Sequence, residues 1–200
     1  MFILYAIPIG IAAGLVLGGS IDRLADLKLR WAPLAVLGLL VQVALFADPI
    51  SSAVGGWAPA IYVGSTAAVL VAVVRDVRLP GMALITVGAG SNLAAIVANG
   101  GYMPASPAAL ASVVELTSGY SNSVVVQDPA LAPLTDLFAL PAGFPLANVF
   151  SIGDVLIGIG VAATIVLAMR RGRQAMSVQT KSESPVLDRG NSRPGQIGRR

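Results

Sequence analysis

The chain has 200 residues, of which 56% are hydrophobic and 12% are charged, and its mean hydropathy is +0.80. A soluble domain carries about 25% charged residues, so this composition excludes an ordinary soluble globule and predicts an all-α integral membrane protein. The chain contains no Cys and no His. This excludes disulfides, thiolate catalysis and the commonest metal and haem ligands, and we expect no enzyme, no metal and no cofactor.

Five apolar segments approach the length of about 20 residues that a membrane-spanning helix needs. Each of them lies near the short end of the usual range. We therefore predict a bundle of five transmembrane helices within residues 1–173. The predicted helices cover residues 2–19, 31–47, 57–74, 81–98 and 151–169.

The basic residues lie on one side of this predicted bundle. All 13 Lys and Arg residues fall in the link 20–30, in the link 75–80 or after Met169, and the links 48–56 and 99–150 contain none. Cytoplasmic links are the ones enriched in Lys and Arg. The sequence therefore predicts a multi-pass protein of the cell (plasma) membrane with its N-terminus outside and its C-terminus inside.

The first predicted helix has an alternative interpretation as a secretory signal peptide. Signal peptides begin with basic residues, and residues 1–5 carry none, so we favour a retained membrane helix. Gly10, Gly14 and Gly18 repeat every four residues and form a flat face that favours close packing. We expect this face to pack within the bundle rather than form a homodimer, because four other helices need partners.

The link 99–150 is too long and too apolar to be an unstructured loop. Ser106 and Pro107 are typical of the N-cap and first residue of a helix, which we predict to run to about Leu116. Residues 123–127 are predicted to be extended, and residues 134–140 to form a helical turn or two. The link therefore predicts a partly helical extracytoplasmic cap, folded on the bundle between its fourth and fifth helices.

Several polar side chains are predicted to lie in the outer half of the bundle. Unpaired polar groups are costly in hydrocarbon, so these side chains should turn inward and converge on a ligand-binding cavity beneath the cap. The outer side carries acids and no bases, which favours a small neutral or cationic ligand that the protein binds or helps to translocate. The candidate ligand-binding residues are Gln42, Asn92, Asn99, Asn148 and Asp154.

Structural roles compete with ligand binding at two of these positions. An amide such as Asn92 also serves as a hydrogen-bonding contact between helices. Ser151-Ile-Gly-Asp154 has the spacing of a capping box at a helix start. A lone carboxylate also argues against an intramembrane aspartyl protease, which needs two. The alternative function is a non-catalytic accessory or scaffold subunit of a larger membrane complex.

The end of the chain is strongly basic. Arg170, Arg171 and Arg173 follow the last predicted helix, and such a run attracts anionic lipid head groups. Residues 174–200 lack an apolar pattern and are predicted to be a disordered cytoplasmic tail. No aromatic residue interleaves these basic ones, so we expect no nucleic acid as a partner. The expected partners are the lipid bilayer and other membrane proteins.

Three stretches carry a family resemblance. They are MFILYAIPIG at residues 1–10 with LADL at 24–27, GSNLAAIVANGGYMPAS at 90–106, and FALPAGFPLANVFSIGDVLIGIG at 138–160. They resemble a bacterial membrane protein family that is catalogued only as a domain of unknown function. The resemblance covers roughly residues 1–170. It implies a bacterial multi-pass membrane protein, and it supplies no activity and no assigned site.

Overall fold

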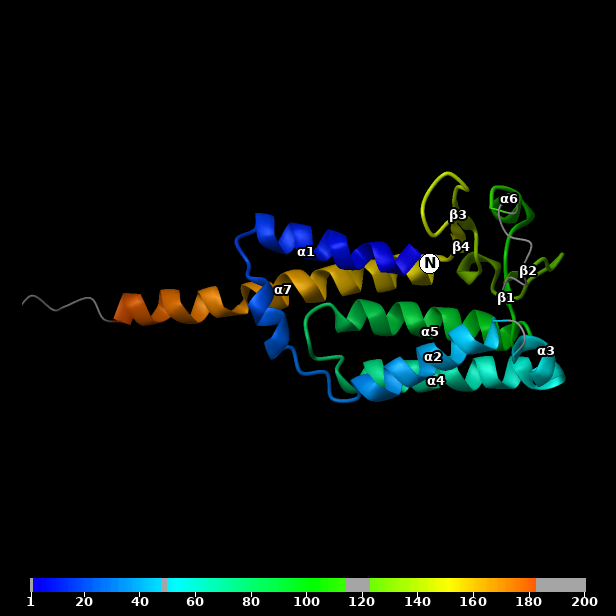
Figure 1. The fold of residues 1–200 in the computed structure, drawn as a ribbon, viewed down its shortest axis with the longest axis horizontal. Helices are drawn as coiled ribbons and strands as arrows, with labels where there is room; N and C mark the ends of the chain where they lie inside the picture. The colour runs from blue at the N-terminus through cyan, green and yellow to red at the C-terminus, as the bar shows by residue number, and fades with distance from the viewer. Residues whose placement is uncertain (1, 48–49, 114–122, 183–200) are drawn as a thin grey trace, which may run out of the picture.

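The computed structural model describes residues 2–47, 50–113 and 123–182, with side chains described as far as Arg171 at the C-terminal end. Figure 1 shows an elongated molecule in which the long helices lie side by side along the long axis. The short helix α6 and the strands gather at one end, which we call the cap end. The opposite end carries the links on either side of η2 and the link between α4 and α5.

Most of the described chain is helical. The N-terminal part comprises η1 Phe2–Tyr5, α1 Ala6–Val16 and η2 Ile21–Asp26, and the centre comprises α2 Ala32–Leu45, α3 Ile50–Val54, η3 Gly55–Trp57, α4 Ala58–Arg75 and α5 Met82–Ala98. The last helix is α7 Ile152–Ser182. Each of the five predicted helices is thus present near its expected place, and their ends differ.

The helix lengths do not support five full spans. Among the described residues, two helical stretches are long and apolar enough to cross a membrane, Gly55–Arg75 and Ile152–Arg171. The other three, Phe2–Val16, Ala32–Leu45 and Met82–Ala98, are apolar but shorter. The first of them ends at Val16, before its predicted end at residue 19, because Gly18 follows in the left-handed conformation. Met82–Ala98 ends at its predicted residue, with Gly100 in the same conformation.

The last helix also departs from its prediction, at its C-terminal end. The backbone of α7 stays helical through residues 174–182, where a disordered tail was predicted, so that part of the prediction is wrong. Helix-forming residues such as Gln, Ala, Met and Lys fill this stretch, and an unbroken helix can continue from an anchored one without packing of its own. The rest of the predicted tail, 183–200, lies outside the described residues.

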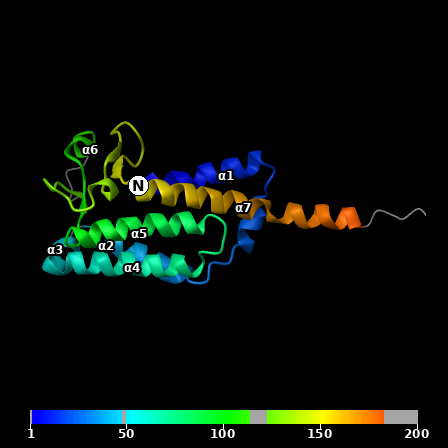
Figure 2. The same ribbon diagram turned by 180° about the vertical axis from the view of Figure 1, so that it is seen from behind.

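Helix α7 packs against both α1 and α5 (Figures 1 and 2). Glycines permit these contacts. A Cβ added at Gly10 would lie 3.0 Å from the Cα of Ala162, and one at Gly14 would meet the sulfur of Met169. A Cβ at Gly88 would meet the carbonyl oxygen of Gly153. The prediction that the glycine face of the first helix packs within the bundle is confirmed at Gly10 and Gly14.

Helices α2 and α4 form a second pair, and α4 also contacts α5. Gly38 of α2 faces the side chain of Val69, where an added Cβ would lie at 2.7 Å. At the cap end of this pair, the rings of Phe46 and Tyr62 meet edge to face with centroids 5.1 Å apart. At the other end, the guanidinium group of Arg75 lies 4.8 Å from the centre of the Trp31 ring.

The cap contains short strands as well as helix, so the fold is not purely α. Strand β1 (Met103–Pro104) pairs in parallel with β2 (Ser123–Val124), and β3 (Phe138–Leu140) pairs antiparallel with β4 (Asn148–Phe150). Helix α6 (Pro107–Ala111) begins at Ser106, whose side chain accepts a hydrogen bond from Ala109 N at 3.1 Å. The N-cap prediction is therefore confirmed.

Two other expectations for the cap are wrong. Helix α6 ends at Ala111 rather than near 116, and residues 114–122 lie outside the described part. The segment 134–140 holds only the end of the 3-10 helix η5 (Ala132–Leu134) followed by β3. Its Phe-Ala-Leu run is extended because it pairs with Asn148–Phe150, a partner that lies beyond the local sequence.

Candidate functional site

Helix α7 begins with a reciprocal capping box. The backbone N–H of Asp154 donates to Ser151 Oγ at 3.1 Å, and the backbone N–H of Ser151 donates to Asp154 Oδ2 at 3.1 Å. Two backbone donors at the helix start, which have no partner within a helix, are satisfied in this way. Ser151 is fully buried, so this start of α7 is fixed inside the molecule.

Asn92 of α5 joins this capping box. Its Nδ2 donates to Asp154 Oδ1 at 2.8 Å, and its Oδ1 accepts from Ser151 Oγ at 2.8 Å. Every side-chain oxygen of the three residues therefore has a hydrogen-bond partner. We call this cluster the Asn92–Ser151–Asp154 joint. It ties α5 to the start of α7 across 59 residues of sequence.

The absence of a side chain at Gly153 allows the Asn92 amide to fit against α7. Gly153 lies under the amide, and an added Cβ would meet Asn92 Oδ1 and lie 2.6 Å from Ser91 Oγ. The neighbouring contact between Gly88 and the Gly153 carbonyl brings the two backbones together at the same level. Short side chains on both helices thus allow a short amide to reach the helix start, in line with the small-residue interfaces of packed membrane helices.

Asn99 has a different role at the end of α5. Its Oδ1 accepts from the backbone N–H of Ala130 at 2.9 Å, and its Nδ2 donates to the Ala130 carbonyl at 2.9 Å. Nδ2 also donates to the Ala95 carbonyl of its own helix at 2.8 Å. The side chain therefore pairs with the cap backbone as a neighbouring strand would. We call this contact the Asn99–Ala130 joint.

The remaining two predicted site residues also have other partners. Gln42 Nε2 donates to Thr66 Oγ1 at 3.2 Å, which ties α2 to α4. Asn148 Nδ2 donates to the carbonyl of Val149 at 2.8 Å, while its Oδ1 is buried without a hydrogen-bond partner in the described structure. The structure thus brings Asn92 and Asp154 together, whereas Gln42, Asn99 and Asn148 bond elsewhere.

The chemistry of the joint is that of a structural contact. The Ser151 hydroxyl donates to an amide oxygen, which is no base, so nothing activates it as a nucleophile. Both carboxylate oxygens of Asp154 are already bonded within the chain. Over the part of the chain that the structure describes, no group of three or more acidic, His or Cys side chains is placed to hold a metal.

Sequence reasoning missed the link between the capping box and the amide. Ser151 and Asp154 were recognisable by their spacing, and Asn92 by its place in an apolar helix. Their pairing depends on how α5 and α7 are aligned, which Gly88 and Gly153 decide by close approach. The glycines at one level of two predicted helices were the available signal.

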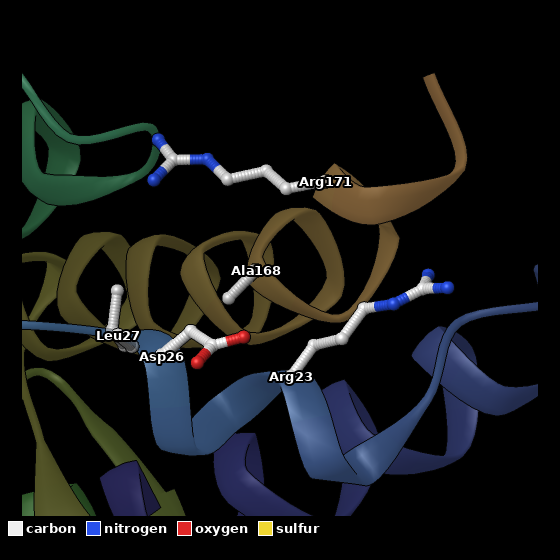
Figure 3. A pocket seen from close by; sticks show the side chains of 5 residues that line it. All are labelled: Arg23, Asp26, Leu27, Ala168 and Arg171. Atoms are coloured by element: carbon white, nitrogen blue, oxygen red, sulfur yellow. The ribbon is translucent and has the colours of Figure 1, made fainter. Parts of the chain in front are cut away.

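A small cavity lies at the end opposite the cap, between η2 and α7, with a volume of about 160 Å³. Arg23 Nη1 donates to the Met169 carbonyl at 3.0 Å, which fixes one wall. Figure 3 shows the Asp26 carboxylate near Ala168, with the two arginine side chains extending to opposite sides. The lining residues are Arg23, Asp26, Leu27, Ala168 and Arg171.

These arginines include one of the predicted head-group contacts. Arg171 lines the cavity, Arg170 is exposed beside it, and the side chain of Arg173 lies outside the described part. The charge pattern predicted that Arg23 lies on the same side of the bundle as these arginines, but not that it lies close to them. Arg23 lies beside Arg171 because η2 packs on α7, where Ser20 N and Arg23 both donate to the carbonyl of Met169.

Comparison with known families agrees with the resemblance noted in the sequence. Residues 26–166 match the model of a family described as "Family of unknown function (DUF5317)". The chain belongs to this family. The matched range holds both joints and all of the cap, and it leaves out α1 and the opening motif at residues 1–10. No curated protein and no solved structure matches the chain.

Proposed function

We propose that this member of the DUF5317 family is a bacterial, non-catalytic accessory protein of the plasma membrane. Its five long helices span the bilayer with the N-terminus outside and the C-terminus inside, and they hold the cap on the outer face as a contact surface for another membrane protein. The observation that carries this function is the use of the polar residues at the cap end. Asn92, Asp154 and Asn99 are all bonded within the chain.

The placement of charge supports the topology. The link holding η2 and the link between α4 and α5 lie at the end opposite the cap (Figure 1), and α7 leaves the bundle there. These elements contain the basic residues of the described chain whose side chains are placed, and cytoplasmic links are the basic ones. They are Arg23, Lys28, Arg30, Arg75, Arg78, Arg170 and Arg171.

The exposed surface of the helices supports a lipid environment. Val36, Leu37, Leu40 and Val43 of α2 are each more than half exposed, as they would be against lipid. Helices α2 and α5, with 14 and 17 residues, are about 21 and 26 Å long, against a hydrocarbon core of about 30 Å. Local bilayer thinning accommodates such short spans at modest cost.

Charge at the opposite end supports head-group contact. Arg170, Arg171 and Arg173 follow the apolar part of α7, where they meet anionic lipid in the proposed topology. Arg171 also lines the small cavity with Arg23 and Asp26. We include this cavity in the proposed contact, because guanidinium groups bind phosphate oxygens well.

Ligand binding is the second candidate, and one observation favours it. The buried Oδ1 of Asn148 has no hydrogen-bond partner within the described chain, and buried amide oxygens are normally bonded. A neutral or cationic ligand with a hydrogen-bond donor would satisfy it at the root of the cap. The accessory role is preferred because Asn148 alone among the predicted site residues keeps such an open oxygen.

Single cysteines test the topology, since the chain has none of its own. We expect an impermeant thiol reagent to label Ala108→Cys of α6 in intact cells and to leave Ala25→Cys of η2 unlabelled until the membrane is opened. Both residues are exposed, so burial does not protect either one. Labelling of Ala25→Cys alone would reverse the topology.

Purification in native lipid tests the function. We expect a protein partner in constant ratio to the chain, lost in Asn99→Ala, which loosens the cap, and kept in Gln42→Ala, which alters only the α2–α4 contact. Mass spectrometry of the purified material measures both. A small molecule retained by the chain and lost in Asn148→Leu, with no protein partner, would instead support the ligand-binding role.

A further inference from the structure

The loop between β3 and β4, residues 141–147, carries large apolar side chains on its surface. Phe144 is 56% exposed and Leu146 is 52% exposed. Phe138, at the base of the same hairpin, is 44% exposed. No charged residue occurs between Asp136 and Asp154, so this hairpin has an apolar surface without the charges that usually border an exposed loop in water.

The backbone of the loop keeps these side chains outside. Leu146 has a φ of 58°, a left-handed conformation that a residue with a branched side chain rarely adopts. Hydrogen bonds from Phe144 N to Pro141 O at 3.0 Å and from Ala147 N to Phe144 O at 3.2 Å form two successive turns. The loop is therefore an ordered structure, and its exposed Phe is held in place.

The loop lies beside the start of α1. The Tyr5 hydroxyl donates to the Pro145 carbonyl, and the ring of Phe2 stacks on that of Phe150 with centroids 4.2 Å apart. In Figures 1 and 2 the loop curls beside the N-terminal end of α1, nearer to the bundle than α6. Its level along the long axis is thus the level at which α1 begins.

We infer that this loop inserts Phe144 and Leu146 into the outer leaflet of the plasma membrane, among the glycerol and upper acyl groups of the lipids. The inference rests on the proposed membrane topology, which puts the start of α1 at the outer interface. Apolar side chains at such a level are buried by lipid to a depth of about 5–10 Å. Lipid fits better than water because the loop is uncharged, and Tyr5 beside it is typical of a membrane–water boundary.

The loop would give the cap a second attachment to the membrane. The Asn99–Ala130 joint holds the cap to the end of α5, and the loop would hold it beside α1. A cap held at two places keeps one orientation towards the membrane surface. The loop is also tied to α6, because Ala142 N donates to the Ser112 carbonyl at 3.3 Å, so α6 would share that orientation.

Fluorescence quenching in vesicles tests this inference. Phe144→Cys is labelled with an environment-sensitive dye in the full chain, reconstituted in phosphatidylethanolamine–phosphatidylglycerol vesicles. Spin-labelled lipids quench from the acyl region and iodide quenches from water. We expect the lipid quencher to act on the dye about twofold more strongly than iodide does, as for a side chain within the interface. Ala108→Cys on α6, which is also exposed, should show the reverse preference.

A third position separates this inference from the proposed function. Ile9 of α1 is 59% exposed and faces lipid in the proposed topology, so dye at Ile9→Cys should be quenched by the spin-labelled lipid. If the spin-labelled lipid did not quench dye at Ile9→Cys, the proposed membrane topology itself would be overturned. Quenching at Ile9→Cys together with iodide quenching at Phe144→Cys would overturn the loop insertion alone. Shielding of Phe144→Cys from both quenchers would also overturn it, since protein rather than lipid would then cover the loop.

A second loop position guards against misfolding of the first variant. Leu146→Cys keeps the neighbouring Phe144 and replaces one exposed side chain by a smaller one. We expect the same lipid-over-iodide preference at this position. Iodide quenching here, in protein that elutes as the unlabelled chain does, would overturn the inference even where Phe144→Cys fails to fold.

Discussion

Two groups of helices in this molecule share an apolar composition and differ in how they are held together. We call α1, α5 and α7 the α7 group, and α2 with α4 the α2–α4 pair. One-third (33%) of the most apolar stretch of α7 is buried, against 17% of that of α4. In the α7 group, glycines such as Gly10 and Gly88 bring backbones together, and Asn92 of α5 bonds to the side chains of Ser151 and Asp154 at the start of α7. In the α2–α4 pair, Gln42 donates to Thr66, and Gly38 lies against Val69 and the Ser65 carbonyl.

The difference shows that apolar content does not decide how closely a helix packs. In a bilayer the lipid tails are as apolar as leucine, so burial of leucine between helices gains little. Close backbone approach, at Gly10, Gly88 and Gly160 in the α7 group and at Gly38 in the α2–α4 pair, supplies the difference together with polar contacts. Thr164 illustrates this, because its hydroxyl donates to the carbonyl of Pro80 at 3.0 Å where Gly81 and Gly160 let the chains meet.

The largest effect is expected where a side chain is forced into the α7 group. Gly88→Leu should destabilise the protein by about 3 kcal/mol, because its side chain would meet the Gly153 carbonyl and Ile157. Gly90→Leu is the matched control on the same helix, since an added Cβ there meets nothing within 4 Å. It should change stability by less than about 0.5 kcal/mol. The midpoint of thermal unfolding in detergent measures both, and equal losses would contradict the packing described.

A smaller effect is expected from removing one amide in each group. Asn92→Leu should cost about 2 kcal/mol, because Asp154 Oδ1 and the Ser151 hydroxyl lose their partner. Gln42→Leu should cost at most about 1 kcal/mol, because Thr66 Oγ1 keeps its bond to the Tyr62 carbonyl. Denaturant titration of both variants gives the comparison. A larger loss in Gln42→Leu would reverse the ranking of the two helix groups.

The smallest effect is expected at the end of the α2–α4 pair opposite the cap. Arg75→Gln removes the contact with the Trp31 ring and should cost about 0.5 kcal/mol. Arg78→Gln removes a nearby positive charge and leaves the contact between Arg75 and the Trp31 ring in place, so it serves as the control. Trp31 emission should shift in the first variant and remain unchanged in the second. An unchanged spectrum in both would mean that the ring contact does not form.

The helices were largely predictable from the sequence, and the cap was predictable only in part, at the start of α6 and in the extended segment that holds β2. Apolar runs marked the five long helices because a hydropathy pattern is local, although Gly18 follows the first of them and that helix ends at Val16 rather than at residue 19. Strand β3 was missed because Phe138–Leu140 is extended only through pairing with Asn148–Phe150. The continuation of α7 to Ser182 was missed because a polar composition suggested disorder, whereas a helix already formed can extend into it.

The candidate site was predictable in its residues and not in their partners. The capping box of Ser151 and Asp154 depends on a spacing of three, which the sequence displays. That Asn92 meets it, while Gln42 meets Thr66, depends on which helices become neighbours. The prediction grouped the five polar residues because they lie at a similar depth in the proposed membrane. Depth does not determine the direction in which a side chain points around its helix axis, so it could not show which of them meet.

The contact between α1 and α7 sets an order for assembly during synthesis. The first helix of the chain finds its partner in the last one, so Gly10 and Gly14 stay uncovered until α7 emerges from the ribosome. Helices α2, α4 and α5 can associate earlier, because α4 contacts both of the others. The hydrogen bond between Asn92 and Ser151 likewise forms only after the whole cap has been translated. The bundle is therefore completed late, and a chain truncated before residue 151 lacks α7, the main partner of its first helix in the described structure.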